Sequence, residues 1–158
     1  LQKGLGFGGP CFPRDNRAIQ QVINRAKNLN YKLPIDNEKF NRDLPDYYSQ
    51  KIQCICNEKN LKNILIVGLT YKDGSYLLEE SQSYSIALKL SKLNNVFYFD
   101  PDVSNKEVIR TITNFDEETN IEGSILLLMC SRDLSKLEIV KSILKKRNLN
   151  FIEIDIWK

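Results

Sequence analysis

The sequence of 158 residues contains no histidine and only four cysteines. Without histidine, the common Ser-His-Asp and Cys-His catalytic arrangements and most zinc sites are excluded, so no metal site is expected. Acid–base chemistry must then rely on carboxylates, lysines or a thiol. Cys11, Cys54, Cys56 and Cys130 lack the spacing of a disulfide framework, which indicates a reducing, cytoplasmic setting.

Long apolar runs and a strong charge imbalance are also absent. No stretch is long enough to span a bilayer and no signal peptide is visible, so we expect no membrane partner. The net charge is +3 and the basic residues are scattered. The densest basic run, 145–147, ends an expected helix, where cations suit the macrodipole. We therefore expect no nucleic-acid partner.

The apolar pattern changes near Asn60. Before it, helical spacing predicts one helix from Pro13 to Ala26 and another from Glu38 to Asn57, which Pro45 either kinks or opens. After it, short apolar runs alternate with helical segments. These predict a strand over 63–69, a helix over 83–93, a strand over 95–101, a helix over 106–112, a strand over 124–130, a helix over 133–147 and a strand over 150–157.

This alternation is typical of a Rossmann-like, mainly parallel α/β sheet in three layers. The last segment alternates apolar and polar residues, which indicates a half-buried strand at a sheet edge. We expect an N-terminal helical domain over 1–60 and an α/β domain over 61–158.

The opening stretch GLGFGGPCFPRD contains a glycine pattern as well as a cysteine. Gly4, Gly6 and Gly9 fit G-x-G-x-x-G, but the dinucleotide fingerprint needs a preceding strand and a helix that opens at the last glycine. Here residues 10–13, with two prolines, follow Gly9. We interpret Gly6, Gly8 and Gly9 instead as positions where the backbone approaches a ligand closely.

Cys11 directly precedes the helix expected at Pro13. The free N–H groups of that helix and the charge of Arg14 favour the thiolate, which is the nucleophilic form. Asp15 stands in the first turn, where it either handles a proton or simply stabilises the helix dipole. A cysteine is more often core filler than nucleophile, but these neighbours favour the nucleophile.

The other candidates have structural interpretations. Cys54 and Cys56 point to different faces of one helix and form no metal pair. Cys130 ends an expected strand and is assigned to the core. Asp100 is interpreted as part of a strand-end turn with Pro101.

Two motifs together resemble the UDP-glucose/GDP-mannose dehydrogenase family. Residues 6–15 (GFGGPCFPRD) resemble its catalytic-cysteine motif. Residues 68–72 (GLTYK), followed by 80–81 and by 98–101 (YFDP), are similar in order and spacing to the start of its C-terminal nucleotide-sugar domain. The resemblance covers nearly the whole chain, as part of the central helical domain plus the C-terminal domain. It implies that the NAD fingerprint and further catalytic residues belong upstream of Leu1.

The resemblance implies oxidation of the C6 alcohol of a UDP-sugar to a carboxylate, with NAD as cofactor and a cysteine-bound thiohemiacetal and thioester as intermediates. Cys11 would be the nucleophile, and Asp15 would assist water or proton transfer. Arg14 would lie near NAD, which is bound mainly by a domain absent from this chain. The substrate contacts would be Phe7, Gly8, Gly9, Tyr71 and Lys72. The helix around 47–56 would form a homodimer face, although its apolar stripe would equally cover the second domain.

Two departures from the family pattern leave alternatives open. Arg14 replaces a lysine, so any role that needs loss of a proton is in doubt. Glu79 stands where an arginine usually faces NAD, and a carboxylate would repel pyrophosphate. Either the cofactor is held differently or activity has drifted. The alternative functions are a non-catalytic nucleotide-sugar-binding and dimerisation module, and a free-standing thiol enzyme.

Overall fold

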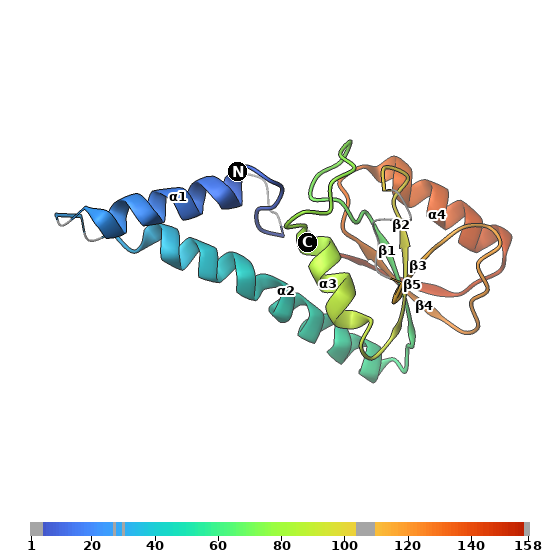
Figure 1. The fold of residues 1–158 in the computed structure, drawn as a ribbon. Coiled ribbons are helices and arrows are strands. Elements are labelled where there is room, and N and C mark those ends of the chain that lie inside the picture. The colour runs from blue at the N-terminus through green and yellow to red at the C-terminus, as the bar shows by residue number, and fades with distance from the viewer. Residues whose placement is uncertain (1–4, 27, 30, 104–109, 157–158) are drawn as a thin grey trace.

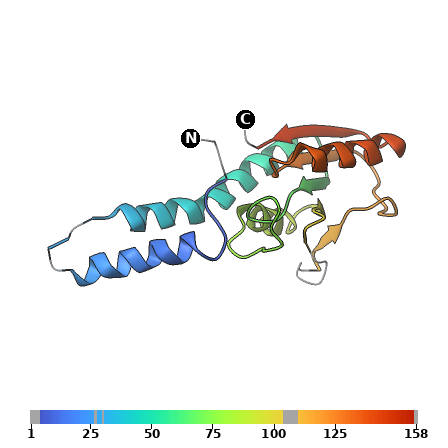
Figure 2. The same cartoon turned by 90° about the horizontal axis from the view of Figure 1, so that it is seen from above.

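The protein consists of a helical hairpin that projects from an α/β part (Figures 1 and 2). The computed structural model describes residues 5–26, 28–29, 31–103 and 110–156. The hairpin is formed by α1 (Phe12–Arg25) and α2 (Leu33–Glu58). The α/β part contains β1 (Asn63–Val67), α3 (Gln82–Leu90), β2 (Asn95–Phe99), β3 (Ile112–Asn114), β4 (Ile125–Met129), α4 (Leu134–Lys146) and β5 (Phe151–Asp155).

The five strands form one parallel sheet in the order β3-β2-β1-β4-β5. Every residue of the central strands β1 and β4 is buried, because helices cover both faces of the sheet. Ile64 and Ile66 face α3 and the C-terminal half of α2, whereas Leu65 and Val67 face α4. The expected parallel α/β class is confirmed, and β5 is an edge strand as predicted.

The second helix and the third strand differ from expectation. α2 begins at Leu33 rather than Glu38, because Pro34 suits a first helical turn, and Pro45 lies inside the helix rather than opening it. β3 was not predicted, since three residues are too few to show a period. The helix predicted over 106–112 falls largely outside the described residues, and its last residue, Ile112, begins β3.

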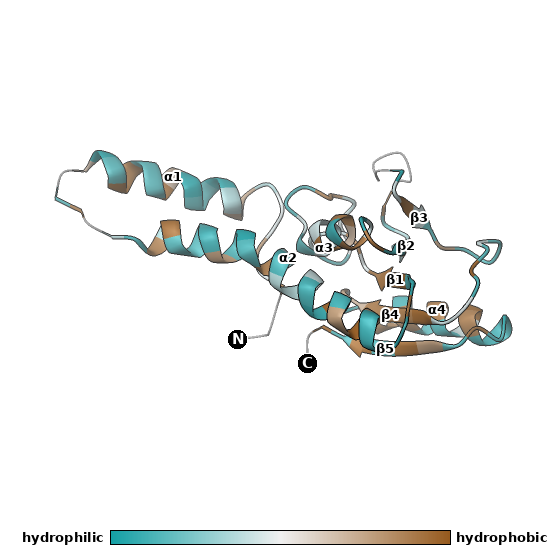
Figure 3. Ribbon diagram, turned by 90° about the horizontal axis from the view of Figure 1, so that it is seen from below, coloured by the Kyte–Doolittle hydropathy of each residue, from teal (hydrophilic) through white to brown (hydrophobic). Residues whose placement is uncertain are grey.

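The hairpin leaves much of its apolar surface exposed. Ile19 and Val22 of α1 are 54% and 63% exposed, and Phe40 and Tyr47 of α2 are 64% and 59% exposed. Apolar segments therefore alternate with polar ones along its surface (Figure 3). Only the C-terminal half of α2 joins the main core, through residues such as Ile52. None of the helices in the described ranges is long and apolar enough to cross a membrane.

A buried ion cluster joins the carboxyl ends of the strands to α4. The Asp100 carboxylate accepts hydrogen bonds from the Leu69 and Thr70 amides (2.7 and 3.1 Å) and from Lys136 Nζ (2.7 Å). Lys136 also bonds Asp102 at 2.8 Å. Burial alone would raise the pKa of Asp100, but these hydrogen bonds outweigh it and the pKa lies below its ordinary value. Asp100 is therefore a buried structural anion rather than only a turn residue.

We predict that Lys136→Met lowers the free energy of unfolding by about 3–5 kcal/mol, because it leaves the Asp100 charge buried and unpaired. Urea denaturation measures the loss. The deficit should shrink in acid: Asp100 stabilises the fold above its unfolded pKa of about 3.9 and loses this effect as the pH falls through its lower folded pKa. Lys146→Met is the control, since Lys146 is 72% exposed. Equal losses in both variants would contradict the prediction.

Candidate functional site

The loop before α1 is held by a buried asparagine of α2. Asn41 accepts a hydrogen bond from the Phe7 amide at 2.8 Å and donates one to the Phe7 carbonyl at 2.9 Å. The preceding Gly6 has a φ of +109°, and a side chain there would collide with the Asn41 amide. The glycine thus lets the loop lie directly on α2, and the amide of Asn41 fixes its path.

The next two glycines bring the loop against the α/β part. A Cβ on Gly8 would clash with the Glu80 carbonyl, and one on Gly9 would lie 2.5 Å from the Tyr71 ring. The Gly9 amide donates to the Glu79 carbonyl at 3.0 Å. The space beside both glycines is therefore occupied by the chain itself. Their expected contact with a sugar remains a prediction.

Cys11 is the N-cap residue of α1 and its side chain is exposed. No side-chain hydrogen bond caps the helix, so the thiol lies at the free N-terminal end of α1. One turn later, Arg14 forms an ion pair with Asp15 at 2.9 Å. The hydrogen bond that Arg14 Nε donates to the Asp15 carboxylate raises the pKa of Arg14. Arg14 thus pairs with Asp15 and also interacts electrostatically with Cys11.

Tyr71 links this loop to the predicted lysine. Its ring contacts Gly9 on the loop, and the Lys72 ammonium lies 5.4 Å from the ring centroid. This is a cation–π distance, and it holds the exposed Lys72 beside the ring. The structure therefore places Gly8 and Gly9 of the first motif against Tyr71 of the second, two residues before Cys11.

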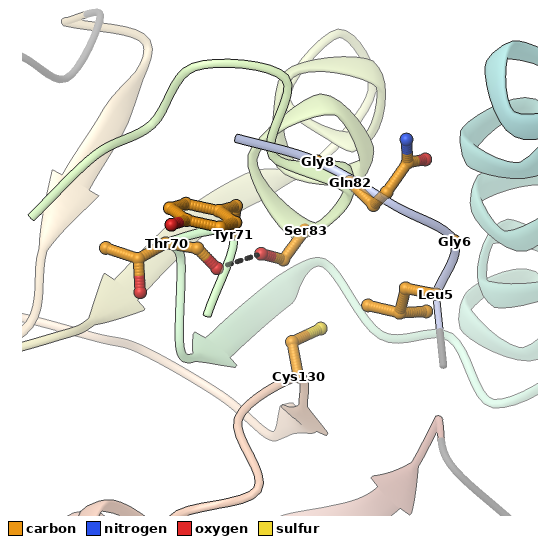
Figure 4. A pocket seen from close by; sticks show the side chains of 8 residues that line it. All are labelled: Leu5, Gly6, Gly8, Thr70, Tyr71, Gln82, Ser83 and Cys130. Atoms are coloured by element: carbon orange, nitrogen blue, oxygen red, sulfur yellow. Dashed lines mark hydrogen bonds between the residues drawn. The ribbon is translucent and has the colours of Figure 1, made fainter. Parts of the chain in front are cut away.

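A cavity of about 240 Å³ opens beside Tyr71 and Lys72. It lies beyond the carboxyl ends of β1 and β4, where the strand order reverses, which is the usual place for a ligand in an open α/β sheet. Its lining consists of Gly6, Gly68, Thr70, Tyr71, Lys72, Asp73, Cys130, Ser131 and Arg132. A smaller hollow of about 40 Å³ lies alongside, between the glycine loop, α3 and Cys130 (Figure 4).

Sequence reasoning missed Asp73, Ser131 and Arg132. The Asp73 carboxylate accepts hydrogen bonds from the Ser131 hydroxyl and, at 3.0 Å, from the Arg132 amide, so it ties the β1 loop to the turn after β4. The signal that could have found these residues is their position after two apolar strands. It becomes useful only once β1 and β4 are known to be neighbours.

The described residues do not form a dinucleotide site. The Cβ positions of Gly8 and Gly9 are occupied by atoms of Glu80 and Tyr71. A Cβ on Gly68 would lie 2.5 Å from Ser131. A pyrophosphate would need that space and a helix N-terminus directly behind it. The residues present at these glycines therefore do not fit NAD.

We predict that Gly9→Ala destabilises the protein more than Gly74→Ala. Both glycines have positive φ (+77° and +71°), which costs an L-residue about 1–2 kcal/mol. Nothing lies within 4 Å of a Cβ at Gly74, whereas Gly9 faces the Tyr71 ring, so overpacking adds about 1–3 kcal/mol there. Urea denaturation of both variants measures the difference. Equal losses would mean that the loop does not depend on this contact.

Comparison with known proteins gives partial matches to one family. No protein-family model matches the chain. The UDP-glucose 6-dehydrogenase of Rickettsia bellii is 34% identical over 103 residues, which are 64% of this chain and 24% of that protein. The UDP-glucose 6-dehydrogenase YwqF of Bacillus subtilis is 28% identical over 129 residues, 78% of this chain and 29% of that protein. The chain spans about a quarter of the length of the curated relatives it matches.

Solved structures agree in fold. A GDP-mannose dehydrogenase from Pseudomonas aeruginosa superposes with a TM-score of 0.70 and 17% identity, over 99% of this chain and 38% of that one. A UDP-glucose dehydrogenase from Pyrobaculum islandicum gives a TM-score of 0.66 and 17% identity, over 96% of this chain and 34% of that one. The chain thus partly matches proteins of the UDP-glucose/GDP-mannose dehydrogenase family in sequence, and it shares the fold of their solved structures.

Proposed function

We propose that the chain is the part of a nucleotide-sugar 6-dehydrogenase that supplies the cysteine nucleophile and the nucleotide-sugar contacts. In this proposal 1–60 belongs to a central helical domain and 61–158 is the nucleotide-sugar domain. One observation carries it: the loop that ends in the exposed Cys11 contacts Tyr71, next to Lys72, at the mouth of the cavity beyond β1 and β4. A nucleophile two residues beyond the Gly9 contact with Tyr71, together with a cation that lines a cavity, suits a reaction on an anionic sugar nucleotide.

The chemistry assigned to this chain is addition to a carbonyl. The Cys11 thiolate adds to the C6 aldehyde of the bound sugar, and the former carbonyl oxygen takes up a proton to give a thiohemiacetal. In the later hydrolysis of the thioester, Asp15 orients the attacking water or receives its proton, and the thiolate leaves. The oxidations between these steps need NAD, which would be bound by another part of the longer protein.

Lys72 is assigned to the phosphates of a UDP-sugar. Its ammonium is exposed and held beside Tyr71, so it is free to meet an anionic ligand at the mouth of the cavity. Arg132 lines the same cavity and adds a second cation. Phe7, whose backbone Asn41 fixes, lies on the same loop as Cys11 and would face the sugar. UDP-glucose is the default ligand, by the names of the relatives.

The exposed apolar face of the hairpin is assigned to a homodimer. Phe40 and Tyr47 border an apolar hollow on α2 together with Leu44. An exposed apolar patch of this kind on a soluble protein commonly marks an interface. Ile52 and Cys56 cover the α/β part instead, so the proposed interface uses the N-terminal half of α2.

We predict that UDP-glucose slows alkylation of Cys11 by iodoacetamide about tenfold or more at saturation, as measured by mass spectrometry of the Cys11 peptide. Lys72→Ala should weaken the protecting ligand about tenfold, which corresponds to about 1.4 kcal/mol of lost phosphate contact. Lys92→Ala, an exposed lysine after α3, is the control. Free glucose should not protect. Absence of protection by UDP-glucose in the wild type would refute the nucleotide-sugar assignment.

Measurement of turnover separates the proposed dehydrogenase from the two alternative functions. When the chain is joined to an NAD-binding domain of the family, the dehydrogenase proposal expects NAD reduction with UDP-glucose and its loss in Cys11→Ser. Protection of Cys11 without NAD reduction would instead establish a nucleotide-sugar-binding module. Acyl turnover at Cys11 without NAD would indicate a free-standing thiol enzyme.

We predict that the double substitution Phe40→Lys with Tyr47→Lys converts a dimer to a monomer in sedimentation velocity. Two charges on the apolar hollow would have to be desolvated in the interface. Leu93→Lys is the matched control, because Leu93 is 71% exposed but lies outside the hairpin. A monomeric wild type, or an unchanged dimer in the double variant, would contradict the assignment.

A further inference from the structure

We propose that Arg17 is a positioning residue, which holds the helix that carries Cys11 at a fixed place relative to Tyr71 and Lys72. This inference rests on the proposed function and extends it beyond the residues that would touch the substrate. Arg17 lies on α1, six residues after Cys11, and it joins this helix to two other parts of the chain.

The contacts of Arg17 connect its own helix, α1, to two other parts of the chain. Its Nε donates to Glu38 Oε1 on α2 at 2.8 Å, and its Nη2 lies 2.7 Å from the same oxygen. Nη2 also donates to Glu80 Oε1 at 2.7 Å, just before α3. One guanidinium thus links α1, α2 and the segment that leads from Tyr71 to α3. The fixed fork of arginine suits this, since a lysine ammonium would not orient two carboxylates in a plane.

Glu80 is held in an unusual backbone conformation at this junction. Its φ is +53°, a region that non-glycine residues rarely adopt. Its carbonyl lies against Gly8, and the neighbouring Glu79 carbonyl accepts from Gly9. Such conformations persist where the surroundings determine them, and they cluster at functional sites. Glu80 therefore contacts the cysteine loop with its backbone and the cysteine helix, through Arg17, with its side chain.

The ion pairs contribute more to position than to stability. Arg17 is 47% exposed and Glu80 is 36% exposed, so solvent screens their attraction and the fold gains little from it. Removing Arg17 would nevertheless leave Glu38 and Glu80 facing each other as like charges. Without the Arg17 link, the 79–80 segment loses its side-chain connection to the hairpin and shifts relative to it, and the Gly9 contact with it.

A displacement of this kind would affect bond formation more than binding. The nucleotide would still meet Lys72 and Arg132 in the cavity, but the thiolate would no longer be aligned with the sugar carbon. Misplacement of a reacting group by about 1 Å can cost about a hundredfold in rate. Arg17 is thus expected to act on the step at Cys11 and to leave nucleotide affinity almost unchanged.

The experiment compares two ligands in isothermal titration calorimetry: UDP-glucose, and its analogue with an aldehyde at C6. The aldehyde forms the thiohemiacetal with Cys11: a C–S bond forms, the C=O π bond breaks and the oxygen takes the thiol proton, so no oxidant is needed. The ratio of the two dissociation constants reports alignment of the thiol, and Cys11→Ser sets the ratio without the covalent bond.

We predict that Arg17→Gln lowers this ratio at least tenfold and changes the UDP-glucose dissociation constant less than twofold. The charge swap Arg17→Glu with Glu80→Arg should restore most of the ratio. Arg42→Gln is the matched control. Arg42 lies on α2 and lines one surface hollow with Arg17, and its ion pair with Asp43 is long, at 3.8 Å. Urea denaturation should show similar stability for all variants.

The outcomes separate this inference from the proposed function. An unchanged ratio in Arg17→Gln, or a parallel loss of ratio, UDP-glucose affinity and stability, would overturn the positioning role. A wild type that binds neither ligand would overturn the proposed function itself. A wild type that binds both equally, as Cys11→Ser does, would remove Cys11 as the nucleophile while leaving nucleotide binding intact.

Discussion

The edge of the sheet that borders the cavity depends on the hydrogen bonds and the ion pair of the buried Asp100 carboxylate. Asp100 ends β2, accepts hydrogen bonds from the first residues after β1 and binds Lys136 on α4. A buried carboxylate is tolerated only when several donors satisfy it, and here the two amide donors belong to the loop that borders the cavity. The loop that carries Tyr71 and Lys72 therefore begins at two residues whose amides are hydrogen-bonded to Asp100.

The cysteine loop is attached to this edge through glycines and hydrogen bonds. Gly6, Gly8 and Gly9 allow contact at backbone distance, and Asn41 and the Glu79 carbonyl accept hydrogen bonds from the loop. Glu80 forms an ion pair with Arg17 on α1. The site is thus formed between the hairpin and the sheet rather than within either.

The departures from the family pattern have different weights in the structure. Glu79 uses its backbone carbonyl to hold Gly9, and its side chain is exposed. The residue at this position can therefore vary without loss of the loop contact. Arg14 keeps a positive charge but pairs with Asp15. Both observations place the unusual side chains outside the contacts that hold Cys11 against the α/β part.

The sequence by itself determined the elements and their class, because hydrophobic period and strand length are local properties. It identified β1, β4 and the edge strand β5, whereas the domain division near Asn60 and the chemistry of the two motifs stay predictions. It did not show β3, which is too short for a period, or the start of α2, where Pro34 opens the helix earlier.

Only the tertiary structure decided what these residues contact. Gly8 and Gly9 lie against Glu80 and Tyr71, which no local pattern indicated, and their contact with a sugar stays a prediction. Asp100 looked like a turn residue until Lys136, 36 residues later, was found beside it. Arg17 and Glu80 are 63 residues apart and carry no local signal. Such pairs depend on strand order and helix packing, which long-range burial sets and no short stretch of sequence records.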